Sequence, residues 1–426
     1  MQQLTILFGM AVLIAIAIAF STNRKAIKLR TVGVAFLLQA SIAAFIMFVP
    51  AGQAVLLSIS KGVAAVMAYS GEGINFLFGD LGKFHSGFIF AIHVLPIIIF
   101  FSALMSVLYY LGIMQRVVRG IGIGVQKLLG TSQAESTAAA ANIFVGNTDV
   151  FVMMKPYAPQ MTKSELFAMM VGGFASVAGS VLVGYAGMGI DIKYLVTAAF
   201  MSAPAGLLFA KILYPETDEA VDVDLDIYKQ EDKPINIIEA ATSGAFTGLK
   251  LAAAVGVMLL ALISLIAMAN GILSSLGELV GFEGLTLQLI FSYVFAPFAA
   301  LLGVPSEEVL AVGNLLGQKL VLNEFVAYLS FAELKGELSM HSQAVATMAL
   351  AGFANLSAPA AMIGVLGTIV PDKKHFIASM GVRVIIGATL ANLMSAALTG
   401  LFLSIPFYFL IKQGFRHRSP SFKFPS

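Results

Sequence analysis

The sequence predicts an all-α polytopic membrane protein with eight transmembrane helices and two re-entrant helical hairpins. Of the 426 residues, 59% are hydrophobic and 11% are charged, whereas a soluble domain has about 45–50% and about 25%. Eight apolar segments are long enough to span a bilayer, and two further half-apolar segments are interrupted by polar residues. This composition excludes a soluble enzyme.

The charge and the cysteine count exclude further classes of function. The net charge of +2 is too small to indicate a nucleic-acid partner. The chain has no Cys, which excludes disulfides, thiolate metal sites and cysteine nucleophiles.

The first apolar segment, 3–21, predicts a retained membrane helix with its N-terminus outside. A signal peptide carries positive charge before its apolar run. Here the basic residues Arg24, Lys25, Lys28 and Arg30 follow the run instead. Positive loops stay in the cytoplasm, so this cluster marks the inner side.

The remaining spans follow from runs of about 20 apolar residues. The eight predicted spans are 3–21, 33–50, 88–113, 164–189, 194–213, 247–272, 343–368 and 377–405. Residues 51–87 are more amphipathic, which favours a position at the membrane interface. Residues 215–234 are strongly acidic and predict a solvated loop.

The two interrupted segments, 131–160 and 304–335, predict hairpins that enter and leave the membrane on one side. Irregular backbone at that depth is tolerated only where protein or water surrounds it. Thr131-Ser132 with Glu135 resembles a helix start, which is sufficient to explain these polar residues.

An internal repeat relates these hairpins. LLG at 128–130 precedes NTDVFVMM at 147–154, and LLG at 301–303 precedes LNEFVAYL at 322–329, which pairs Asp149 with Glu324. Related cores follow at 169–179 and 348–358. Counting spans gives the two units opposite orientations. Inverted repeats with broken helices are typical of secondary transporters.

Glu324 is the candidate functional residue, because it lies in an otherwise apolar neighbourhood. A charge at the bilayer centre costs about 2.5–3.5 kcal/mol even on insertion scales. One interpretation is a structural ion pair with Lys319. The other is a carboxylate at a helix break that accepts hydrogen bonds from sugar hydroxyls, which the inverted repeat favours.

Residues 317–328, GQKLVLNEFVAY, resemble the signature of concentrative nucleoside transporters. The signature residues are Gly317, Lys319, Asn323, Glu324, Phe325, Val326, Ala327 and Tyr328. The similarity continues through 23–33, 100–112, 139–146, 165–176 and 352–357, so it covers nearly the whole chain. The bacterial, sodium-coupled branch is the most similar.

The resemblance implies a nucleoside symporter, not an enzyme, in the bacterial inner membrane. It implies import of uridine, cytidine or adenosine with sodium as the coupling ion. It also implies a homotrimer with interfacial helices, in which a transport domain moves against a trimeric scaffold by alternating access. The chain then divides into scaffold helices 1–118, a first repeat 119–213, an acidic loop and long scaffold helix 214–280, a second repeat 281–411 and a basic tail 412–426.

The resemblance also implies roles for individual residues. Glu324 and Asn355 would bind the ribose hydroxyls, with Phe353 near the sugar. The base would be met by Asn147, Thr148, Asp149, Val181 and Leu251. Sodium would be held by side-chain oxygens of Asn142 and Ser176 and by the carbonyls of Val145 and Val177.

The chain departs from the family at the binding site. The family usually has Gln-Thr-Glu followed by Ala-Pro at the first hairpin tip, where this chain has Asn147-Thr148-Asp149 and then Val150-Phe151. Both polar side chains are one methylene shorter, so base contacts must be longer, water-bridged or rearranged. Ala358 stands where bacterial relatives often have Ser, which removes a ribose hydrogen bond worth about 0.5–1.5 kcal/mol.

Three alternatives remain at this point. Proton coupling predicts the loss of oxygen ligands at the sodium site, but Asn142 and Ser176 are present. An intramembrane hydrolase using Glu324 and Asp149 lacks a His pair, a metal motif or an activated nucleophile. A passive channel rarely needs two inverted hairpins.

Overall fold

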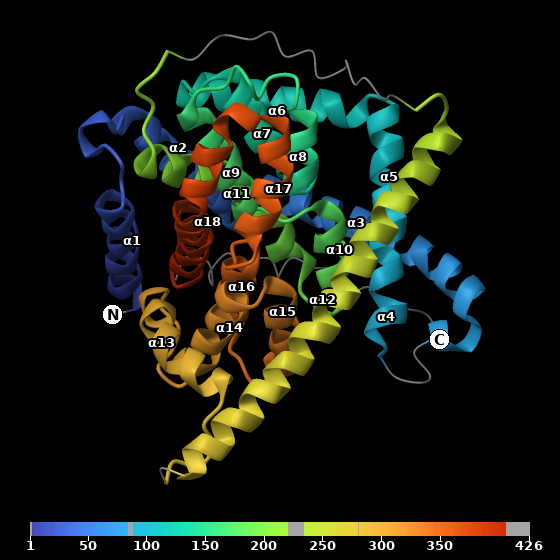
Figure 1. Cartoon of the computed structure of the whole chain (residues 1–426), viewed down its shortest axis with the longest axis vertical. Helices are drawn as coiled ribbons and strands as arrows, with labels where there is room; N and C mark the ends of the chain where they lie inside the picture. Colours follow the sequence, from blue (N-terminus) through green and yellow to red (C-terminus); the bar gives the residue numbers. More distant parts are fainter. Residues whose placement is uncertain (1, 84–87, 220–233, 280, 406–426) are drawn as a thin grey trace.

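The computed structural model describes residues 2–83, 88–219, 234–279 and 281–405, and within these ranges it is helical without a strand (Figure 1). Most of the acidic residues of the predicted loop and the whole basic tail (Lys412, Arg416, Arg418 and Lys423) lie outside the described residues.

Five helices precede the repeats. They are α1 (Gln2–Ala19), α2 (Leu29–Phe48), α3 (Pro50–Phe78), α4 (Phe90–His93) and α5 (Leu95–Tyr110). Proline lies in the first turn of α3 and of α5. Proline is well suited to this position because the first N–H groups of a helix have no intrahelical acceptor.

The helix order of the next part of the chain occurs twice. The first set is α6 (Ile113–Leu129), α7 (Gln133–Ala141), α8 (Asn147–Met153), α9 (Lys163–Ala175), α10 (Gly179–Gly187) and α11 (Ile192–Leu213). The second set is α13 (Leu287–Leu301), α14 (Val309–Val321), α15 (Glu324–Leu334), α16 (Met340–Leu350), α17 (Ala358–Ile369) and α18 (Lys374–Leu403). Each set is one helix, two short helices, a helix broken in two, and a long helix. We call α7–α8 the first helix pair and α14–α15 the second.

The repeat has a different register from the one read off the sequence. Asp149 was paired with Glu324, but the first residue of α8 is Asn147 and the first residue of α15 is Glu324. Asn147 therefore corresponds to Glu324. The sequence match followed apolar letters inside the helices, whereas the register is set by where the backbone resumes its helical path after each turn.

Eight helical segments of the described chain, one of them α9 with α10 (Lys163–Gly187), are long and apolar enough to cross a membrane, which is the predicted number, but one member differs. Residues 343–368 form two helices, α16 and α17, each too short to span. Their place in the count is taken by α3, which the sequence assigned to the interface but which is long and apolar enough to span.

The first two helices of the predicted scaffold 1–118 contact the repeats. Helix α1 packs on α18 and α13, and α2 packs on α11 and α18, so both lie against the repeats. Helices α5 and α12 (Ile237–Leu279) instead pack extensively on each other. With 43 residues, α12 is about 65 Å long, about twice the bilayer core, and it crosses the molecule diagonally (Figure 1).

Two glycines allow the close approach of α5 and α12. A Cβ on Gly244 would overlap the Ser106 side chain, and one on Gly248 would lie 2.7 Å from the Ile99 Cα. Small residues at such crossings let helix backbones approach closely inside membranes.

Replacing Gly248 by Ala should destabilise the protein by about 1–3 kcal/mol, because α5 and α12 must separate. The matched control is Gly271→Ala in the same helix, where a Cβ would have no atom within 4 Å. Alanine favours a helix by about 1 kcal/mol over glycine, so the control should be neutral or stabilising. Thermal unfolding of the purified protein measures both. Equal melting temperatures for Gly248→Ala and Gly271→Ala would contradict the close packing of α5 on α12.

Candidate functional site

The turns of both helix pairs and the breaks of both interrupted helices meet in the middle of the protein. Three backbone hydrogen bonds join them. Gly179 N donates to Phe144 O at 3.0 Å, Leu356 N donates to Leu320 O at 3.0 Å, and Phe353 N donates to Ser176 O at 3.3 Å. The third bond connects one break directly to the other.

Two buried residues, Lys319 and Asn392, donate hydrogen bonds to carbonyl groups at the ends of α9 and α16. Lys319 Nζ donates to Ala349 O at 2.6 Å and to Asn392 Oδ1 at 2.7 Å. Asn392 Nδ2 donates to Ala175 O at 2.7 Å and to Ala351 O at 2.9 Å. The last four carbonyls of a helix have no intrahelical partner, so this pair supplies donors where both helices stop.

Two signature residues thus have packing roles that the sequence did not indicate. The ammonium of Lys319 is bound to Asn392 and a carbonyl, and no ion pair joins it to Glu324 in the described chain. A Cβ on Gly317 would overlap the ring-bearing Cβ of Phe291, so Gly317 allows α14 to approach α13.

Glu324 is the first residue of α15 and is 3% exposed. Its Oε1 accepts from the Tyr185 hydroxyl at 3.2 Å, and its Oε2 accepts from Asn355 Nδ2 at 3.3 Å. A helix N-terminus also favours a negative charge. The carboxylate is therefore held by two neutral donors and a helix dipole.

Asn355 can only present its amide nitrogen to Glu324. Its Oδ1 accepts from Ser357 Oγ at 2.7 Å and from Ala358 N at 3.0 Å, at the start of α17. The Nδ2 group of Asn355 therefore points at the Glu324 carboxylate. Glu324 and Asn355, both predicted to bind the ribose, are thus hydrogen-bonded to each other, and Phe353 lies half-buried two residues before Asn355.

Tyr185 was not among the site residues predicted from the sequence. It lies on α10, is fully buried, and its ring centroid is 4.3 Å from that of Tyr328 and 4.8 Å from that of Phe325. Phe325 thus supports the tyrosine that holds Glu324. The available indication was a tyrosine inside the predicted span 164–189, because a buried phenol needs a hydrogen-bond partner.

Asn323 caps the helix that Glu324 begins. Its Oδ1 accepts from Val326 N at 2.9 Å, while its buried Nδ2 has no partner among the described residues. The two N–H groups of this amide are therefore free, on the residue that precedes Glu324.

Asn142 has an unpaired side chain in a buried position. It ends α7, is 1% exposed, and neither its Oδ1 nor its Nδ2 has a partner in the described chain. It faces α9 at Gly172 and Gly173. Ser176, at the end of α9, donates from Oγ to Gly173 O at 3.3 Å.

The other two predicted sodium-site residues are close by along the chain. Val145 follows Phe144 and Val177 follows Ser176, and the bond from Gly179 N to Phe144 O joins these two segments. The first turn and the first break therefore bring all four residues to one region.

The predicted base-binding residues are more dispersed. Asn147 packs against Gly173, and its Oδ1 accepts from Thr148 N at 2.7 Å. Thr148 and Asp149 are exposed, Val181 is buried on α10, and Leu251 is half-buried on α12. Within the described ranges, no hydrogen bond connects any of them to Glu324.

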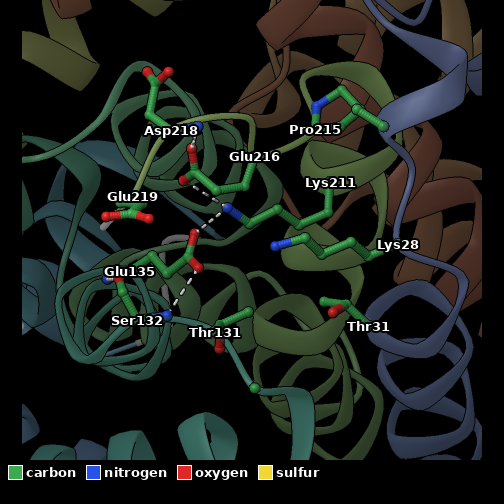
Figure 2. A pocket seen from close by; sticks show the side chains of 12 residues that line it. Lys28, Thr31, Thr131, Ser132, Glu135, Lys211, Pro215, Glu216, Asp218 and Glu219 are labelled. Carbon is green, nitrogen blue, oxygen red and sulfur yellow. Dashed lines mark hydrogen bonds and ion pairs between the residues drawn. The ribbon is translucent and has the colours of Figure 1, made fainter. Parts of the chain in front are cut away.

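A second polar cluster, also missed, lies at the base of the first helix pair (Figure 2). Glu135 forms a capping box with Ser132, as its spacing predicted, and also pairs with Lys211 of α11 at 2.6 Å. Lys211 reaches between Glu135 and Glu216 beside a cavity of about 440 Å³, and its Nζ also donates to Ser164 Oγ at 2.9 Å. In the second repeat, Glu308 accepts from Ser339 N and Oγ, both at 2.9 Å. Both helix pairs thus have a carboxylate bound at the base.

Comparison with known proteins decides the family. Models described as the N-terminus and C-terminus of Na+ dependent nucleoside transporters match residues 8–81 and 194–400, and one described as nucleoside recognition matches 91–191. The chain is 46% identical to the Helicobacter pylori nucleoside permease NupC, covering 93% of this chain and 97% of that one. The chain belongs to the concentrative nucleoside transporter family.

Other relatives of this transporter agree. It is 51% identical to a Haemophilus influenzae protein described only as an uncharacterized transporter, covering 95% and 99% of the two chains. It is 39% identical to human solute carrier family 28 member 3, over 82% of this chain and 52% of the human one. The transporter CNTnw in an inward-facing substrate-bound state has a TM-score of 0.90 at 48% identity, covering 95% and 99%.

Removing the Asn392 amide should destabilise the transporter strongly. Asn392→Ala leaves the Lys319 ammonium and two carbonyls short of partners, and each buried unsatisfied group costs about 1–3 kcal/mol. We expect a loss of about 3 kcal/mol or more in the free energy of unfolding. The double variant Lys319→Met/Asn392→Leu should lose less than the sum of its single changes.

The matched control is Asn270→Ala. Asn270 also donates and accepts, bonding to Gln288 and to Leu287 N, but in a half-buried position between α12 and α13. It should cost about 1 kcal/mol. Equal decreases in melting temperature for Asn392→Ala and Asn270→Ala would contradict a larger stabilising role for the Lys319–Asn392 hydrogen bonds.

Proposed function

We propose that this nucleoside transporter is a sodium-coupled symporter in which Glu324 and Asn355 bind the ribose. The observation that carries the proposal is the buried Glu324 carboxylate, whose protein partners are both neutral. A carboxylate has about four acceptor sites, so each oxygen retains capacity after its bond to Tyr185 or Asn355. Two neighbouring sugar hydroxyls are donors of suitable spacing for the two oxygens.

Tyr185 is a positioning residue in this proposal. The phenol fixes one carboxylate oxygen and Asn355 fixes the other, so the carboxylate plane is set before the nucleoside arrives. Fixing a group in its bound geometry beforehand raises affinity because less freedom is lost on binding. Asn323, the residue before Glu324, has a further donor in its unpaired Nδ2.

The sodium assignment is supported by the unpaired Asn142 side chain. Buried polar atoms without partners are rare and each one needs an explanation, such as a bound ion. Neutral side-chain and carbonyl oxygens suit a monovalent cation, and broken helices provide free carbonyls in transporters. Asn142, Val145, Ser176 and Val177 would hold the ion. The name of the matching family models, Na+ dependent nucleoside transporter, supports the same assignment.

We extend the proposal to the transport cycle and assembly. The repeated helix order supports two inverted units whose helix pairs are re-entrant hairpins, moving by alternating access. Structures of CNTnw described as inward-facing, intermediate and outward-facing match this chain with TM-scores of 0.90, 0.92 and 0.91. A homotrimer in the bacterial inner membrane, importing uridine, cytidine or adenosine, completes the proposal.

Tyr185→Phe should weaken uridine binding by about tenfold, because a hydrogen bond to a charged group is worth about 1.5–3 kcal/mol. Glu324→Gln should cause a more severe loss. Tyr185→Phe should also narrow the preference for uridine over 2′-deoxyuridine and 3′-deoxyuridine, since the carboxylate would no longer be fixed. Calorimetry on the purified protein gives these affinities.

The matched control is Tyr328→Phe. Tyr328 packs on Tyr185, but its hydroxyl donates to Thr347 O at 2.8 Å and not to Glu324. It should leave the ribose preference unchanged. Unchanged uridine affinity in Glu324→Gln would make Glu324 structural, and identical preferences in the two tyrosine variants would remove Tyr185 from the site.

Asn142→Leu and Ser176→Ala should reduce the increase in uridine affinity that sodium causes, with Glu324 left intact. By linkage, uridine must raise sodium affinity by the same factor, so both titrations should show the same loss. Ser202→Ala is the matched control, because Ser202 is also buried and donates to a carbonyl three residues earlier. Equal uridine accumulation in choline and sodium, driven instead by an acid-outside gradient, would replace sodium by protons.

A further inference from the structure

Helix α6 has three different sides. Its buried side is formed by Met114, Gln115, Val118, Gly122, Val125 and Leu129. These residues pack mainly on α7. With 3.6 residues per turn, they form one continuous stripe, and the remaining residues divide into two flanks.

One flank is basic. Arg116, Arg119 and Lys127 are all exposed, and none has a hydrogen bond or ion pair within the described ranges. The helix contains no Asp or Glu. The positive charge of this flank is therefore not neutralised by its own helix.

The other flank is apolar. Ile113, Val117 and Leu128 are 42%, 38% and 52% exposed. At 100° per residue they lie on the opposite side of the buried stripe from the cations. Gly120 lies between the two flanks on the outer face and Gly124 lies within the apolar flank, and an added Cβ at either would meet no atom within 4 Å.

The position of α6 matches this pattern. Figure 1 shows it lying across one end of the molecule, roughly perpendicular to α1, α5 and α18. A helix parallel to the membrane plane, with one apolar and one cationic side, is typical of a helix that lies in the lipid headgroup region.

We infer that α6 binds anionic phospholipids, with its basic flank on the headgroups and its apolar flank in the acyl region of the same leaflet. An anionic lipid has a negative headgroup for the basic flank and acyl chains for the apolar flank, whereas an acidic soluble protein provides only the negative charge. Basic residues near a bilayer surface attract such headgroups. Because α6 connects α5 to the first helix pair, bound lipid would hold the segment from which that pair begins.

The absence of Trp from the chain allows a direct test. Val117→Trp introduces a single fluorophore on the apolar flank, next to Arg116. The full-length protein is reconstituted into phosphatidylcholine vesicles containing phosphatidylglycerol, with bromine on the acyl chains of one lipid or the other. We expect brominated lipid to quench the fluorescence, and brominated phosphatidylglycerol to quench about twofold or more better at equal mole fraction.

The preference should disappear when Arg116, Arg119 and Lys127 are all changed to Gln, and should persist when Arg116 and Arg119 are changed to Lys. Phe8→Trp, on the exposed face of α1, is the control and should be quenched equally by both lipids. Absence of quenching at Val117→Trp would mean that a protein surface covers the flank, and would overturn the inference. Equal quenching by brominated phosphatidylcholine and brominated phosphatidylglycerol would contradict the preference of the basic flank for anionic headgroups.

Discussion

The structure depends on how the broken helices satisfy their free backbone groups. A helix that stops inside a membrane leaves carbonyls without donors, and lipid provides none. Lys319 and Asn392 together donate to the carbonyls of Ala175, Ala349 and Ala351, so one pair serves the ends of α9 and α16. Gly352 makes this arrangement fit, because a Cβ there would overlap the Asn392 amide. The two repeats can therefore place four helix ends around one centre.

The use of Lys319 in this network also determines the character of Glu324. A lysine five residues away would be the obvious counter-ion, but its ammonium is bound to oxygen atoms at the helix ends. The carboxylate is left with Tyr185 and Asn355, which orient it without cancelling its charge. Under the proposed function, the charge remains available to the hydroxyls of a substrate.

Much of the fold was predictable because hydropathy is written along the chain. The composition, seven of the eight spans and the repeat are local patterns, and Glu324 was noticeable as a charge in an apolar segment. The contacts of Tyr185 with Glu324, of Lys319 with Asn392 and of Glu135 with Lys211 join residues far apart in sequence. No spacing rule encodes such contacts, so only the three-dimensional arrangement reveals them. The segments 164–189 and 343–368 were both predicted as broken helices, and they form α9 with α10 and α16 with α17, but the second is not among the helices long enough to span.

The carboxylates at the bases of the two helix pairs have a mechanical consequence. Glu135 attaches the start of α7 to α11, and Glu308 attaches the start of α14 to the start of α16. At the opposite ends, the backbone bond from Gly179 N to Phe144 O joins the first pair to α10, and Glu324 joins the second pair to Tyr185 and Asn355. Each pair is thus attached at its base through a carboxylate. A displacement of α11 or of the start of α16 therefore carries the base of the attached pair with it.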